Sequence, residues 1–125
     1  MNIHESAEDY LECVYMESLR RGVVRSIDVA NALGFSKPSV SVAMKQLEEN
    51  GYIHRDEDRF IHLTDKGMEI ALRMYERHQT LAACLIKMGV SEENAYKDAC
   101  KIEHDLSDES FSHIRDYARK FLSEN

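Results

Sequence analysis

The feature that most restricts the fold is a pair of short helical segments joined by a tight turn, in the first half of the chain. The first helix is predicted over residues 27–33, with Ser26 as its N-cap. The turn "GFS" follows, and a second helix is predicted over residues 37–50, capped by Ser36. Pro38 falls in its first turn, where the missing N–H costs nothing. This spacing is typical of a helix–turn–helix.

The flanking segments extend this motif. Residues 6–20 are predicted as a helix with Ser6 as N-cap, and residues 52–63 as a β-hairpin around an acidic turn. The apolar stripe of the first helix comprises Leu11, Val14, Tyr15 and Leu19. A helix–turn–helix followed by a two-stranded hairpin indicates a winged helix.

Three further helices are predicted after the hairpin, over residues 64–88, 92–105 and 108–123. Gly89 ends the first of them, and the other two begin at the N-caps Ser91 and Ser107. The fold class is therefore mainly α, with a winged-helix domain over residues 1–63 and a helical domain over residues 64–125.

The composition places the chain among cytoplasmic proteins but does not favour nucleic acid. No apolar run approaches the roughly 20 residues of a membrane span, and no secretory pattern is seen at the N-terminus. Three cysteines do not make a disulfide framework. The net charge is −7, and the segment 22–63 carries −1 of it. Binding to DNA therefore has to rest on local geometry rather than on a basic surface.

The second helix of the helix–turn–helix supplies that local geometry. Val40, Ala43, Met44 and Leu47 are expected to face the core. The side chains left outward, together with the proline of the first turn, are candidate DNA contacts, because lysine and serine bind phosphates or base edges and valine can touch a thymine methyl. The predicted DNA-binding set, which includes two arginines of the hairpin strands, is Lys37, Pro38, Ser39, Ser41, Val42, Lys45, Gln46, Arg55 and Arg59.

The stretch "DACKIEHDLSDES" contains three good metal ligands within a span of five residues. Cys100, Glu103 and His104 share one sector of the predicted helix, because spacings of three and four return to the same side. They are expected beside a core stripe made of Ala95, Ala99, Ile102 and Leu106.

Two other helices carry ligands that can complete a site. Asp9 and Glu12 share a face of the first helix, and His78 lies on the long helix. Six ligands on three helices are enough for one or two divalent ions. Carboxylate and imidazole suit Fe²⁺ and Mn²⁺, whereas a thiolate shifts the preference toward softer ions. Each residue also has a structural alternative: Asp9 as a helix cap, and Cys100 as a small apolar residue. Cys13 and Cys84 are interpreted as packing residues.

Several separated segments resemble the diphtheria toxin repressor / manganese transport regulator family of metal-dependent transcriptional repressors. These segments are "EDYLECVY", "RSIDVANALGFSKPSVSVAMKQLEENGYI", "LTDKG", "RH" at residues 77–78 and "DACKIEHDLSDE". The resemblance covers nearly the whole chain and is closest to the shorter, two-domain branch. It implies repression of metal-uptake genes by a homodimer that binds Fe²⁺ or Mn²⁺, one or two per protomer, and then a palindromic operator.

The resemblance carries over the metal ligands Asp9, Glu12, His78, Cys100, Glu103 and His104. The set is a hybrid, because Asp9 is typical of manganese-type members and Cys100 of iron-type members. Tyr96 and Ala82 stand where iron-type members have the histidine and glutamate of a second site. The two-fold symmetry of such operators favours a dimer, whose predicted interface is Phe111, Ile114, Ala118 and Phe121.

Three alternatives compete with a metal sensor. One is a winged-helix repressor that responds to a redox signal at Cys100 or to a small ligand. Another is a protein-interaction module with a vestigial metal site, which the presence of six plausible ligands disfavours. The third is a metalloenzyme, since carboxylate–histidine sites can activate water. The sequence offers no separate nucleophile, acid or oxyanion donor and no glycine-rich phosphate loop, so an enzyme is not expected.

Overall fold

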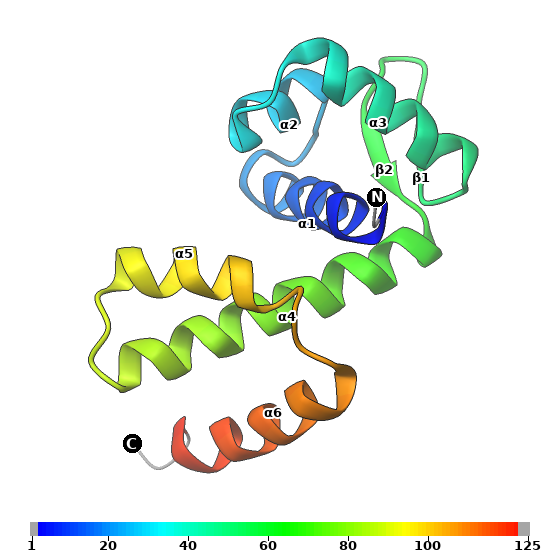
Figure 1. Cartoon of the computed structure of the whole chain (residues 1–125). Coiled ribbons are helices and arrows are strands. Elements are labelled where there is room, and N and C mark those ends of the chain that lie inside the picture. Colours follow the sequence, from blue (N-terminus) through cyan, green and yellow to red (C-terminus); the bar gives the residue numbers. More distant parts are fainter. Residues whose placement is uncertain (1–2, 123–125) are drawn as a thin grey trace. The chain divides into compact units, whose positions relative to one another are not determined.

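The computed structural model describes residues 3–122 and is mainly helical, as predicted (Figure 1). The chain divides into two compact units, residues 1–73 and 74–125. In order, the elements are α1 (Ile3–Arg21), α2 (Ser26–Leu33), α3 (Lys37–Glu49), β1 (Ile53–Arg55), β2 (Ile61–Leu63), α4 (Asp65–Lys87), α5 (Glu92–Ile102) and α6 (Asp108–Leu122). None of the helices described is long and apolar enough to cross a lipid bilayer.

Three of the predicted helix caps are confirmed. The hydroxyl oxygens of Ser36, Ser91 and Ser107 each accept a hydrogen bond from the backbone N–H three residues later, at 3.3, 3.3 and 3.0 Å. Each bond satisfies one of the four N–H groups that the first turn of a helix leaves without a partner. The beginnings of α3, α5 and α6 are therefore set by local sequence.

Two other predicted caps are wrong. Helix α1 begins at Ile3, so Ser6 lies inside it. Helix α2 is capped by Arg25, and Ser26 is its first residue. Here Asp28 takes over the capping role, since its carboxylate accepts from the Arg25 N–H at 2.9 Å. An aspartate at the third helical position thus replaces the serine hydroxyl that the sequence suggested.

The first unit surrounds a continuous apolar core. Helices α1, α2 and α3 and the two strands all contribute to it, through residues such as Leu11, Val29, Met44 and Ile53. Leu19 was predicted in the buried stripe of α1, but 62% of it is exposed. The inward position near that end of α1 is held instead by Glu17. Two ion pairs with arginines of the following turn make that burial possible, at 3.0 and 2.8 Å.

The hairpin is short and antiparallel. Ile53 pairs with Leu63, and His54 pairs with His62 across the strands. Asp56 organises the turn: its Oδ1 accepts from the N–H groups of Asp58 and Phe60, at 2.9 and 3.0 Å. Its Oδ2 lies 2.8 Å from His62 Nε2. The predicted hairpin is therefore present, and its tip is closed by a side-chain carboxylate.

Arg59 was predicted on a strand, and this is wrong. It lies in the turn between β1 and β2, with φ of 66°. The left-handed region is unfavourable for a side chain with a Cβ, so the hydrogen bonds of the Asp56 turn hold Arg59 there.

A carboxylate of α3 is bonded to the first strand. Glu48 Oε1 accepts from the Arg55 guanidinium at 2.9 Å, and its Oε2 accepts from the Arg55 backbone N–H, also at 2.9 Å. The hydrogen bonds with Arg55 lower the pKa of Glu48 below its ordinary value.

This pair predicts a specific acid dependence of stability. Because the pKa of Glu48 is lower in the folded state, its ionised carboxylate contributes fully to folding stability at pH values above the ordinary carboxyl pKa. This contribution is lost as the pH falls through the lowered pKa of Glu48 in the folded protein. We expect Glu48→Gln to reduce the slope of thermal midpoint against pH in the acid range. The control is Glu49→Gln, because Glu49 is the exposed neighbour. Identical acid profiles for Glu48→Gln and the wild type would contradict this.

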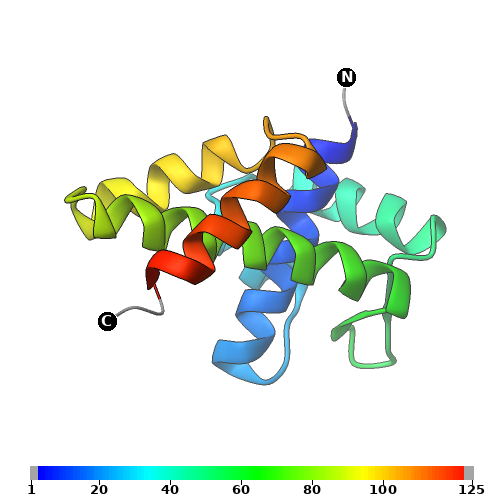
Figure 2. The same ribbon diagram turned by 90° about the horizontal axis from the view of Figure 1, so that it is seen from below.

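The second unit consists of the remainder of α4 with α5 and α6. In both views α5 runs alongside the C-terminal half of α4 (Figures 1 and 2). Its core is small: Leu81 and Ala82 of α4 pack with Ala99 of α5 and Phe111 of α6. Leu106 and Ile114 pack against this core.

The end of α5 differs from the prediction. The helix stops at Ile102 rather than at residue 105, and Ile102 is 37% exposed instead of buried. The next residue, Glu103, is completely buried. The helix therefore ends immediately before the predicted ligands Glu103 and His104, and its periodicity does not predict their burial.

The cysteines described have no disulfide partner. Cys13 is buried in the core of the first unit, as its packing interpretation predicts. Burial, with the nearby carboxylates of Glu17, Glu12 and Asp9, raises the pKa of its thiol to about 12. Burial also raises the pKa of Cys84. Both thiols are therefore protonated near neutral pH, which makes them poor nucleophiles.

Candidate DNA-binding helix and metal-ligand cluster

Helix α3 presents an open polar face. Val40, Met44 and Leu47 are buried and Ala43 is half-buried, as predicted. All seven predicted DNA contacts on this helix are exposed, namely Lys37, Pro38, Ser39, Ser41, Val42, Lys45 and Gln46. The hydroxyl of Ser39 also receives a 2.8 Å hydrogen bond from Ser36, which orients it at the start of the helix. The face is therefore accessible along its N-terminal half, the part of a recognition helix that enters the major groove.

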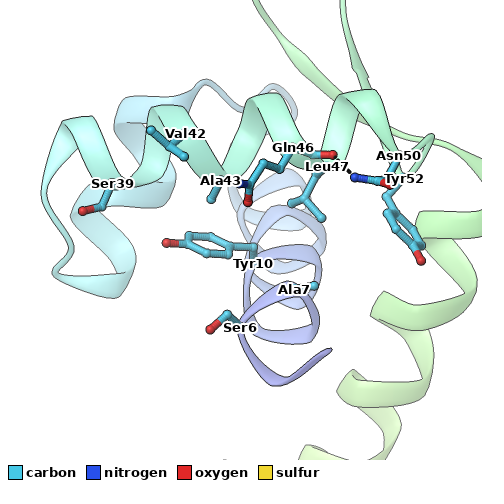
Figure 3. Close-up of a pocket in the computed structure, with 10 residues that line it drawn as sticks. All are labelled: Ser6, Ala7, Tyr10, Ser39, Val42, Ala43, Gln46, Leu47, Asn50 and Tyr52. Carbon is cyan, nitrogen blue, oxygen red and sulfur yellow. Dashed lines mark hydrogen bonds between the residues drawn. The ribbon is translucent and has the colours of Figure 1, made fainter. Parts of the chain in front are cut away.

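A groove of about 420 Å³ runs beside this face, between α1 and α3 (Figure 3). Ser39, Val42 and Gln46 line it from α3, and Tyr10 extends into it from α1. Tyr52 closes the far end. The groove beside the recognition helix is thus lined by uncharged side chains.

Two acids of α3 bear on the charge problem raised by the sequence. Glu49 is exposed, whereas the charge of Glu48 is neutralised by its bond to Arg55. The sequence reasoning missed this pair; the signal was an arginine seven residues after a glutamate across a predicted turn. The guanidinium of Arg55 consequently has a partner within the protein, whereas Arg59 is exposed in the turn.

The second unit brings one carboxylate and two imidazoles together. His78 Nδ1 of α4 lies 4.0 Å from Glu103 Oε2, and His104 Nε2 lies 3.7 Å from Glu103 Oε1. The Glu103 side chain is 0% exposed, that of His104 is 4% exposed and that of His78 is 13% exposed. Three of the six predicted ligands therefore form a buried cluster.

The orientation of His78 is fixed by a backbone carbonyl. Its Nε2 lies 3.2 Å from the carbonyl oxygen of Tyr96, and the Tyr96 ring packs edge-on against the imidazole. Because a carbonyl only accepts, Nε2 carries the proton, and Nδ1 is then the lone-pair nitrogen of the neutral ring. Nδ1 is the nitrogen that faces Glu103. A metal-binding histidine commonly has its second nitrogen held in this way.

The other three predicted ligands lie on α5 and α1. Cys100 is exposed on α5, and its Sγ lies within 4.8 Å of a carboxylate oxygen of Glu103. Asp9 and Glu12 lie one turn apart on α1 in the first unit, the former half-buried and the latter 5% exposed. Like Glu103, Glu12 is therefore a carboxylate withdrawn from water.

Arg77 is a residue that the sequence reasoning did not assign. It is 5% exposed, and its guanidinium donates to the carbonyl oxygens of Glu103 and Leu106, both at 3.0 Å. It also pairs with the carboxylate of Asp108 and lies over the Phe111 ring. The signal available in the sequence was its place directly before His78, a predicted ligand.

The donors of the second unit fit a divalent transition metal. The buried carboxylate of Glu103 has an imidazole nitrogen of His78 or His104 within 4.0 Å of each of its oxygens. Carboxylate oxygen and imidazole nitrogen are the ligands that Mn²⁺ and Fe²⁺ accept.

A winged helix with an open recognition helix, in one chain with a buried carboxylate–imidazole cluster, defines a metal-responsive DNA-binding protein. The family model described as "Iron dependent repressor, N-terminal DNA binding domain" matches residues 2–61. The model described as "Iron dependent repressor, metal binding and dimerisation domain" matches residues 64–123. The chain belongs to this diphtheria toxin repressor / manganese transport regulator family, whose members are metal-dependent transcriptional repressors and not enzymes.

Individual relatives agree with the family models. The chain is 37% identical to the HTH-type transcriptional regulator MntR of Geobacillus kaustophilus over 116 residues, which covers 93% of this chain and 82% of that protein. It is 33% identical to an uncharacterised HTH-type transcriptional regulator of Methanocaldococcus jannaschii, which covers 94% and 95%. The structure also resembles a solved manganese-dependent transcriptional repressor in complex with manganese, with a TM-score of 0.80 and 27% identity. That match covers 90% of this chain and 52% of the solved one, so the chain spans about half of its length.

Proposed function

We propose that this chain is a cytoplasmic repressor that senses Fe²⁺ or Mn²⁺ and controls metal-homeostasis genes. A homodimer binds a palindromic operator when one or two metal ions are bound per protomer. Residues 1–63 form the DNA-binding domain, and residues 64–125 form the metal-binding and dimerisation domain. The observation that carries the proposal is the buried carboxylate of Glu103 with an imidazole nitrogen within 4.0 Å of each of its oxygens.

The proposed ligands are those of the sequence analysis, with two contributed by the first unit. Glu103, His104 and His78 supply the cluster of the second unit, and Cys100 adds a thiolate from α5. Asp9 and Glu12 supply carboxylates from α1. A divalent ion held by these residues would supply positive charge to carboxylates such as Glu12 and Glu103, which are buried.

In this mechanism the metal restricts the orientation of the winged helices in the dimer rather than creating them. The first unit has its own core and its recognition face is already formed. The face that we assign to DNA comprises the seven exposed residues of α3 together with Arg55 and Arg59. The predicted dimer contact on α6 comprised Phe111, Ile114, Ala118 and Phe121. Phe111 and Ala118 are only 5% and 4% exposed on the chain by itself, so the proposed contact is through Ile114 and through Phe121, which is 44% exposed.

Fluorescence anisotropy with DNA from the chain's own promoter region tests the proposal. The titration is made anaerobically under reducing conditions with Mn²⁺, Fe²⁺ or a chelator. We expect metal to tighten binding by about 5- to 150-fold, the usual range of an allosteric coupling. Equal binding with chelator would overturn the metal-sensing function and favour a redox or small-ligand signal. The relative concentrations of Mn²⁺ and Fe²⁺ that are needed give the metal preference.

A further inference from the structure

Arg77 is a buried cation whose hydrogen bonds go to the backbone of the segment that carries the predicted ligands, and not to their ligand atoms. The guanidinium donates to the Glu103 and Leu106 carbonyl oxygens at 3.0 Å each. The same side chain pairs with Asp108 at the start of α6. One buried cation on α4 therefore holds both ends of the connection between α5 and α6.

The connection needs such a partner because α5 ends where the ligands begin. Glu103 caps the helix and its N–H donates to the Ala99 carbonyl at 3.0 Å. The carbonyls beyond a helix end have no partner within the helix. Arg77 provides one from another helix, and a guanidinium is suited to this task because its donors form a rigid planar fork.

Two consecutive residues of α4, Arg77 and His78, thus face opposite ends of Glu103. His78 faces the Glu103 carboxylate, with Nδ1 at 4.0 Å from Oε2. Arg77 holds the Glu103 carbonyl. A glutamate held at its main chain keeps few of the orientations that a loop residue would otherwise sample. The adjacent His104 is held through the same backbone.

We propose that Arg77 is the positioning residue of the metal centre, fixing Glu103 and His104 through their main chain without touching the ion. The inference rests on the proposed function, because it assigns to Glu103 and His104 the ligand role proposed above. Its consequence is that part of the metal affinity resides in a residue with no ligand atom of its own. Changes to groups that hold metal ligands in place typically weaken binding by about 10- to 100-fold.

The test compares Arg77→Met with Arg115→Met in the full chain. Arg115 is a matched control: it also lies near the Phe111 ring, but its hydrogen bond goes to Glu76 at 3.5 Å. Mn²⁺ affinity is measured by the electron paramagnetic resonance signal of free Mn²⁺, at a temperature where circular dichroism shows a folded protein. Co²⁺ absorption in the visible range reports the ligand geometry, which a loss of stability alone does not alter.

We expect Arg77→Met to bind Mn²⁺ about 10- to 100-fold more weakly and to change the Co²⁺ spectrum. Arg115→Met should retain the wild-type affinity and spectrum. Arg77→Lys keeps the charge without the fork and should recover only part of the affinity. If Arg77→Met does not fold, Arg77→Lys carries the test with the same two readouts. An affinity and a spectrum equal to those of Arg115→Met would overturn the inference.

Glu103→Gln distinguishes this failure from that of the proposed function. If Glu103→Gln loses Mn²⁺ while the Arg77 variants keep it, the inference alone is wrong. If the wild-type chain binds neither Mn²⁺, Fe²⁺ nor Co²⁺, the proposed function fails and the inference with it.

Discussion

Glu103→Gln is expected to abolish the tightening of DNA binding by metal while leaving metal-free binding unchanged. The substitution keeps the shape of a side chain that is 0% exposed but removes the charge that an ion requires. A ligand that binds only the folded state adds about 2.7 kcal/mol of stability at a concentration 100 times its Kd. The variant should lose this gain, which thermal unfolding with and without Mn²⁺ measures directly.

Glu93→Gln is the matched control for this experiment. Glu93 lies in the first turn of α5, the helix that Glu103 caps; it is exposed and pairs with Lys97 at 3.3 Å. Its replacement should leave both the metal-induced rise in thermal midpoint and the DNA response intact. A Glu103→Gln protein that still responds to Mn²⁺ like the Glu93→Gln protein would exclude Glu103 as a ligand.

Gly67→Ala is expected to give the largest loss of stability in the first unit. A Cβ at this position would lie 2.0 Å from the carbonyl oxygen of Tyr52 and 3.0 Å from its carbonyl carbon. The obstacle is backbone, and it is held there because the Tyr52 carbonyl accepts from the Thr64 N–H at 3.1 Å. We expect a cost of about 3 kcal/mol, at the upper end of typical overpacking. The thermal midpoint should fall by roughly 10–20 °C.

Gly22→Ala separates this clash from the general cost of replacing a glycine. Gly22 has φ of 85° but open space around its Cβ position. Its replacement should cost about 1–2 kcal/mol, from backbone conformation alone. If Gly67→Ala unfolds no earlier than Gly22→Ala, the close approach of α4 to Tyr52 does not exist in solution.

The fold was largely predictable where local chemistry decides it. Ser36 and Ser91 begin their helices because a hydroxyl next to free N–H groups is a short-range signal. The prediction was wrong at Ser26, because the carboxylate of Asp28 competes successfully for the same backbone. It was wrong for Leu19 because Glu17 gains two arginine partners within its own helix, and hydrophobicity alone does not anticipate that.

The candidate site was predictable in its donor types but not in its burial. The spacing of Glu103 and His104 pointed to ligands, yet helical periodicity placed them beside the core stripe and placed Ile102 within it. The structure reverses this, with Ile102 37% exposed and Glu103 0% exposed. Arg77, which lies 26 residues away in the sequence, donates to the buried carbonyl of Glu103, and no local pattern reports a contact over that separation.

The two hydrogen bonds between Glu48 and Arg55 give the winged helix a property that matters for any partner touching both α3 and β1. They connect the recognition helix to the hairpin, so the two elements approach a surface as one rigid body. Once the helix has docked, the hairpin is held at a high effective concentration beside that surface. Little further ordering is then needed for the second contact, and binding keeps more of the free energy that the contacts provide.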